Sequence, residues 1–103
     1  MIDKFQFSTV ARLRELLATM ERDLGLTSLS SNELDLLYAV RLVSDQNKEP
    51  IVEASDIREH PITRQMSQPT FNRTIRSLLE KGYLETAPNH KAKRYQLSSR
   101  AAM

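Results

Sequence analysis

The sequence predicts a mainly helical fold with a small β-hairpin, in which three core helices follow an N-terminal helix. Apolar residues recur at spacings of three and four over most of the 103 residues, which is the period of an amphipathic helix. Serine precedes three of these runs and glycine follows two, as expected at helix ends. A hairpin is expected at residues 83–86 and 94–97, where apolar and polar residues alternate.

The N-terminal helix is expected over residues 8–24, with Gly25 as its stop. Its apolar residues form a narrow stripe with the spacing of a heptad seam. Such a stripe packs either on the core of its own domain or on the same helix of a second subunit. In the second case the dimer interface consists of Val10, Leu13, Leu17, Met20 and Leu24.

The second helix has a clear start signal, because Ser30 and Glu33 have the spacing of a capping box. Apolar residues on most sides of this helix, Leu42 among them, predict that it is the buried central helix. A polar loop at residues 45–48 ends it. Residues 51–53 are expected to form an edge strand, and Ser55 is expected to cap a short helix over residues 56–60 that Pro61 stops.

The last long helix is expected over residues 67–81, with Ser67 as N-cap, Pro69 in the first turn and Gly82 as its stop. Its inward face consists of Phe71, Ile75, Leu78 and Leu79. At about 100° per residue, the opposite face carries polar and basic side chains, Ser77 among them. The candidate DNA-contacting residues of this helix are Gln68, Thr70, Asn72, Arg73 and Arg76.

Charge is divided unevenly along the chain, although the formal net charge is only +2. Residues 62–103 carry eight basic and two acidic side chains, so the C-terminal part can form an anion-binding face. Arginine can bond bidentately to guanine and asparagine to adenine, while the threonine methyl group can touch thymine. The hairpin loop, residues 87–94, adds cations that would lie along the DNA backbone or enter the minor groove: Lys91, Lys93 and Arg94.

A short helix, a turn and a second helix with a polar face make a helix-turn-helix, and the basic hairpin after it would be a wing. Residues 29–97 resemble the winged-helix domain of MarR-type bacterial transcription regulators. The similarity lies in residues 29–37 and 67–73 and, most strongly, in Leu-Leu-Glu-Lys-Gly-Tyr-Leu at residues 78–84. The resemblance implies a homodimer that binds specific DNA sequences, usually as a repressor.

Two features depart from that family. Its wing usually carries an Asp-x-Arg pair, whereas the loop here has Arg94 without an acid beside it. The family's C-terminal dimer helices have no counterpart before Met103, so we expect any dimer to use the first helix or the winged core. The chain is accordingly divided into an N-terminal helix that is a candidate dimerisation arm (1–28), a winged-helix DNA-binding domain (29–98) and a flexible tail (99–103).

Enzymatic chemistry has little support in the sequence, and we expect no cofactor and no metal site. His60 and His90 lie in separate segments without ligand spacing, and there is no cysteine. The sequence has no signal-peptide pattern and no apolar run of membrane-spanning length, so a cytoplasmic location is the default expectation. Whether an effector exists is open. The alternative function is a winged-helix protein-interaction module, in which the apolar stripe binds a different protein and the basic face does not contact DNA.

These assignments predict two different effects on DNA binding. Arg73→Ala should change the preferred DNA sequence, because it removes a base contact, whereas Lys91→Ala should weaken binding to every duplex and lower its salt dependence. Salt titrations of binding to several duplexes measure both effects. An affinity that does not respond to salt for any duplex contradicts the assignment.

Overall fold

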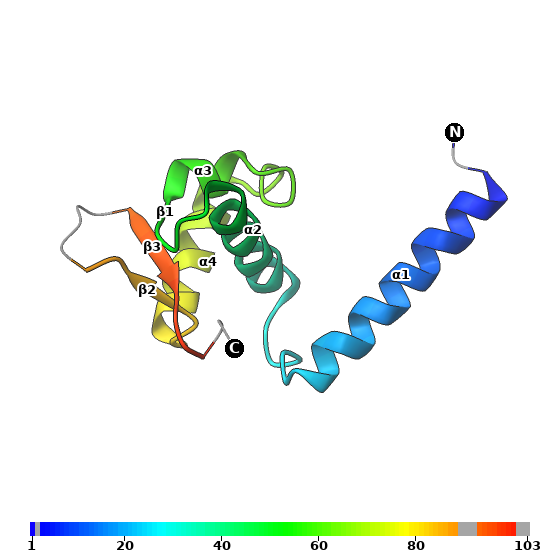
Figure 1. The fold of residues 1–103 in the computed structure, drawn as a ribbon, viewed down its shortest axis with the longest axis horizontal. Coiled ribbons are helices and arrows are strands. Elements are labelled where there is room, and N and C mark those ends of the chain that lie inside the picture. The colour runs from blue at the N-terminus through cyan, green and yellow to red at the C-terminus, as the bar shows by residue number, and fades with distance from the viewer. Residues whose placement is uncertain (2, 89–92, 101–103) are drawn as a thin grey trace. The chain divides into compact units, whose positions relative to one another are not determined.

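The computed structural model describes residues 1, 3–88 and 93–100, and it has a mainly helical fold with a small antiparallel sheet (Figure 1). The predicted fold class is confirmed at this level. The elements, in chain order, are α1 (Lys4–Asp23), α2 (Ser31–Asn47), β1 (Val52–Glu53), α3 (Ala54–Glu59), α4 (Gln68–Glu80), β2 (Leu84–Thr86) and β3 (Arg94–Leu97). No helix in this part of the chain is long and apolar enough to cross a membrane.

The chain divides into two compact units, Met1–Ser30 and Ser31–Met103. The first unit contains α1 and the turn after it, and the second contains every other helix and strand. The predicted boundary between residues 28 and 29 lies two residues before this division. Each unit is described below by itself.

Helix α1 begins at Lys4, earlier than the predicted start at Ser8, because Asp3 and Gln6 form a capping box. The Asp3 carboxylate accepts a hydrogen bond from the Gln6 backbone N–H (2.8 Å), and the Gln6 side chain accepts one from the Asp3 N–H (2.9 Å). The helix ends before Gly25, whose φ of 74° suits glycine. No residue of α1 is buried, and the apolar stripe, including Leu13 (61% exposed), faces solvent.

Helix α2 is the central helix of the second unit, as predicted. It buries Leu36, Ala39 and Val40 completely and contacts α3, α4 and the sheet. Leu42 is 46% exposed, so the prediction that it belongs to the buried run is wrong. The reason is geometric, since Leu42 points about 140° away from the centre of the buried face at about 100° per residue.

The three strands form one sheet in the order β1-β3-β2, with both pairs antiparallel. The predicted edge strand and hairpin are both present. Helix α3, however, starts at Ala54 directly after β1, and its N-cap is Glu53 without a side-chain cap bond; the predicted Ser55 cap is wrong. The Ala54 N–H instead donates to the Lys93 carbonyl of the hairpin (2.9 Å), which fixes the start of α3 to the sheet.

Helix α4 follows its prediction closely. The Ser67 hydroxyl accepts a hydrogen bond from the Thr70 N–H (3.2 Å), and Gly82 follows the helix with a φ of 81°. Phe71, Ile75 and Leu78 are buried as expected. The fourth predicted core residue, Leu79, is only partly buried; Thr74, which was not predicted to be buried, joins the buried face.

The core of the second unit gives a stability prediction. Leu36→Ala should lower the free energy of unfolding by about 2–5 kcal/mol, because Leu36 is fully buried in α2 and its truncation leaves a cavity. Leu42→Ala, on the exposed side of the same helix, should cost less than about 1 kcal/mol. Urea denaturation measures both values, and equal losses would contradict the placement of the core.

Candidate functional site

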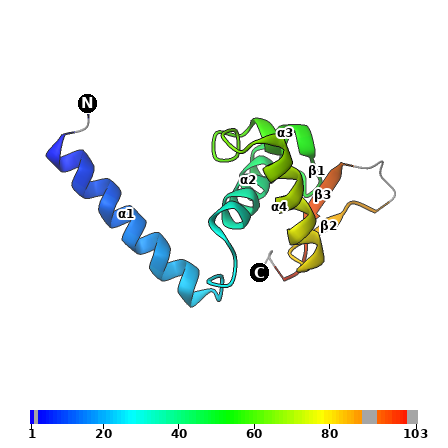
Figure 2. The same cartoon turned by 180° about the vertical axis from the view of Figure 1, so that it is seen from behind.

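A groove of about 540 Å³ lies between α3, α4 and the start of β3, all within the second unit. In Figure 2, α3 and α4 lie next to each other, and the strands lie beside α4. Both helices contribute polar side chains to the groove, while Phe71 and Ile75 contribute apolar surface. The groove is lined by Ala54, Ser55, Arg58, Glu59, Gln68, Phe71, Asn72, Ile75, Arg76, Leu79, Lys93 and Tyr95.

Four of the predicted DNA-contacting residues meet at this groove. Gln68, Asn72 and Arg76 follow one another at four-residue steps along one side of α4. Lys93 faces the same groove from the base of the hairpin. The structure thus brings two segments, separated by sixteen residues of sequence between Arg76 and Lys93, to one surface.

Thr70 and Arg73 lie outside the lining of this groove. The Arg73 guanidinium donates to the Thr70 hydroxyl (3.2 Å), which also accepts a hydrogen bond from the Ser67 hydroxyl (2.9 Å). Thr70 is partly buried, whereas Arg73 is exposed. The predicted α4 residues therefore form two groups. Gln68, Asn72 and Arg76 line the groove, and Thr70 and Arg73 contact each other near the start of the helix.

Arg94 is paired within the sheet. Its guanidinium lies 2.9 Å from the Glu53 carboxylate, and Glu53 is its register partner on β1. The acid that is missing beside Arg94 in the loop sequence is therefore supplied by a different strand. Lys91, the remaining predicted hairpin contact, lies outside the described residues.

Arg58 is the residue of the site that sequence reasoning missed. Its guanidinium donates to the backbone carbonyls of Thr63 (3.1 Å), Arg64 (3.0 Å) and Met66, and to the Gln68 side-chain oxygen (3.3 Å). It also lies over the Phe71 ring, 5.6 Å from the centroid. One side chain of α3 thus holds the turn before α4. A lone arginine in a short helix carries no sequence signal for this role.

Arg58 also begins a hydrogen-bonded row along the groove. Gln68 accepts from Arg58 through its side-chain oxygen and donates to Asn72 through its amide nitrogen (3.0 Å). Because an amide oxygen accepts two hydrogen bonds and an amide nitrogen donates two, Asn72 keeps both an acceptor and a donor function for a ligand. The row orients the Asn72 amide before any ligand arrives.

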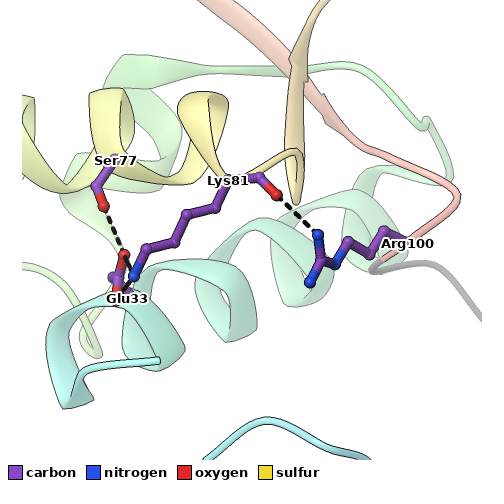
Figure 3. Close-up of polar contacts among 4 residues, drawn as sticks. All are labelled: Glu33, Ser77, Lys81 and Arg100. Atoms are coloured by element: carbon purple, nitrogen blue, oxygen red, sulfur yellow. Dashed lines mark hydrogen bonds and ion pairs between the residues drawn. The ribbon is translucent and has the colours of Figure 1, made fainter. Parts of the chain in front are cut away.

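The other side of α4 is fastened to α2 by Glu33, which is 5% exposed (Figure 3). Its carboxylate accepts a hydrogen bond from Ser77 (2.7 Å) and forms an ion pair with Lys81 (2.9 Å). Ser77 was predicted to lie on the exposed face and is instead partly buried in this contact. The sequence indicated only a capping role for Glu33. No sequence pattern links Glu33 to Ser77 and Lys81, which lie 44 and 48 positions further along the chain.

Arg100 reaches the end of the same helix (Figure 3). It donates to the Lys81 carbonyl (3.2 Å) and lies over the Tyr83 ring, 4.6 Å from the centroid. Tyr83 itself is buried. These contacts connect the segment after β3 to the C-terminal end of α4.

The groove and its surroundings can bind an anionic ligand through guanidinium, ammonium and amide groups. In the described residues, no three His, Cys, Asp or Glu side chains come together as metal ligands would. No family model, curated protein or solved structure matches the chain.

The contacts of Arg58 give a second stability prediction. Arg58→Met should lower the free energy of unfolding by about 2–3 kcal/mol, because partly buried carbonyls of the turn lose a charged donor. Thermal or urea unfolding measures the loss. Arg64→Met is the matched control, since Arg64 is an exposed arginine in the same turn whose backbone carbonyl is kept, and it should change stability by less than about 0.5 kcal/mol.

Proposed function

We propose that this chain is a transcription regulator that binds duplex DNA through a winged helix-turn-helix of the MarR type. In this proposal α3, the turn held by Arg58 and α4 form the helix-turn-helix, and the β2–β3 hairpin is the wing. The observation that carries the proposal is the groove, where Gln68, Asn72 and Arg76 of α4 lie with Lys93 of the hairpin. Two separate elements thereby offer base-contacting and phosphate-contacting groups on one surface.

Helix α4 suits the major groove in size and chemistry. A helix with its side chains is about 10–12 Å across, and the major groove of B-form DNA is about 12 Å wide. Arg76 and Asn72 are exposed and have the functional groups that pair with guanine and adenine, respectively. Arg73, near the start of α4, is placed for the base or phosphate next to them.

The hairpin supplies the sequence-independent part of binding. Lys93 is exposed at its base, and Lys91 lies in the loop outside the described residues. Ammonium groups near phosphates release counterions, so their contribution decreases as salt increases. Arg94 has a different role in this proposal, because its pairing with Glu53 braces the base of the wing.

Helix α1 is the proposed dimer interface. Its stripe of Val10, Leu13, Leu17, Met20 and Leu24 is exposed over most of its length, and large apolar stripes of this kind mark association surfaces. A two-fold dimer would bind a palindromic site whose half-sites lie about one helical turn, 34–36 Å, apart or a multiple of it. Repression is the regulatory outcome that the family resemblance implies.

The proposal is tested by selecting bound sequences from a random duplex pool with the full chain. We expect one palindromic motif to be enriched, and its affinity to decrease steeply with salt. Enrichment of no motif, together with an affinity that salt does not change, would show that the chain does not bind DNA in this way.

Arg76 gives a sharper prediction on the selected site. Arg76→Ala should weaken binding by about 1–3 kcal/mol, and the loss should be smaller on a site with the contacted base changed. Arg41→Ala is the control, since it removes the same charge from an exposed position on α2, and it should leave the affinity within about twofold. Fluorescence anisotropy with labelled duplexes measures both, and equal losses would argue against a base contact by α4.

A further inference from the structure

Two hydrogen bonds beside the groove run in one direction, from Arg58 to Gln68 and from Gln68 to Asn72. The Arg58 Nε donates to the Gln68 Oε1 (3.3 Å), and the Gln68 Nε2 donates to the Asn72 Oδ1 (3.0 Å). A guanidinium carries only N–H donors and has no acceptor. The Gln68 side chain therefore turns its oxygen toward Arg58, which leaves its nitrogen for Asn72.

Arg58 is a fixed starting point for this order, because its other N–H groups are bonded within the turn. They donate to backbone carbonyls, those of Thr63 (3.1 Å) and Arg64 (3.0 Å) among them. The guanidinium also lies over the Phe71 ring. Inverting the Gln68 amide would place an N–H group against this guanidinium, so the orientation of the amide is set from α3.

The order leaves Asn72 with a defined hydrogen-bonding pattern for a ligand. Gln68 takes one lone pair of the Asn72 oxygen, and no other described residue bonds that oxygen or the amide nitrogen. Asn72 is exposed, so these groups are accessible. Among the base edges in the major groove, that of adenine has an acceptor, N7, beside a donor, N6, and one amide can bond both.

We infer that Gln68 is a positioning residue, which fixes the Asn72 amide in the order that bonds adenine. This inference rests on the DNA-binding proposal above and names the base at one position of the site. The oxygen and the nitrogen of Gln68 each have a partner within the protein, Arg58 and Asn72. Asn72 is then the residue that contacts the base, and Gln68 acts through it.

The variant Gln68→Glu tests this role, because it replaces one nitrogen by an oxygen at nearly the same size. The new carboxylate can still accept from Arg58, so the turn keeps its charged contact. It cannot donate to Asn72, whose amide should turn to donate to the carboxylate and present its oxygen to the base.

Sequences are selected from a random duplex pool with the wild-type and the variant full chains. Asn72→Ala identifies the position that Asn72 contacts, because the preference at that position is lost. There the preference of Gln68→Glu for adenine should be lower by at least about fivefold, and cytosine, whose N4 is a donor, should gain. Gln68→Ala frees the amide without inverting it, so adenine should lose preference without a gain for cytosine.

Gln65→Glu is the matched control. Gln65 is an exposed glutamine in the turn before α4, and it has no side-chain hydrogen bond to the described residues. The variant adds the same negative charge near the DNA. It should therefore weaken binding to all duplexes alike and leave the preference for adenine unchanged.

Nuclear magnetic resonance of the full chain without DNA gives a second readout. In Gln68→Glu the side-chain amide resonances of Asn72 should shift as the new carboxylate titrates between about pH 3 and 6, because that amide then donates to it. The wild-type chain is the reference, since Glu59 lines the groove in both proteins.

An unchanged preference for adenine in a Gln68→Glu chain that binds DNA overturns the inference and leaves the DNA-binding proposal standing. An Asn72 amide that shifts no more in the variant than in the wild-type chain also overturns it. Enrichment of no motif by the wild-type chain contradicts the DNA-binding proposal, and the adenine contact is overturned with it.

Discussion

The position of α4 depends on one guanidinium, that of Arg58. The turn between α3 and α4 has no helix or strand of its own to satisfy its carbonyls, and Arg58 bonds three of them and also the first side chain of α4. A buried or partly buried carbonyl without a partner is costly, so the Arg58 donor stabilises the turn in this form, in addition to the backbone hydrogen bonds that Thr63, Arg64 and Met66 donate within it. Glu33 completes the arrangement from the other side, by holding the C-terminal half of α4 against α2.

Local signals in the sequence were enough to predict the elements. Ser67 and Gly82 delimit α4 because a cap and a left-handed stop act within a few residues of the helix end. The same reasoning failed at Ser55, since the start of α3 is set by a bond from Ala54 to Lys93, a residue far along the chain. It also missed the true start of α1, where Asp3 and Gln6 form a capping box with a less common pair of residues.

The candidate site could be predicted only in part. Periodicity identified which α4 residues are exposed, and Gln68, Asn72 and Arg76 do share a side of the helix. Periodicity could not identify the partners of these residues. Arg58 with Gln68, Glu33 with Ser77, and Glu53 with Arg94 are contacts between segments far apart in the sequence, and no repeating pattern in the sequence marks them. The residues that hold the site were therefore harder to predict than those that form its surface.

The link between β1, α3 and the hairpin has a consequence for the kind of duplex the protein would accept. Glu53 pairs with Arg94, and the next residue bonds the Lys93 carbonyl, so the hairpin base and the start of α3 form one piece. Arg58 then joins α3 to α4. These contacts hold the base of the hairpin, α3 and the start of α4 at a fixed spacing. If the chain binds DNA as proposed, this fixed spacing would suit the wide major groove of B-form DNA, and A-form duplexes, with their deep and narrow major groove, would be bound less well.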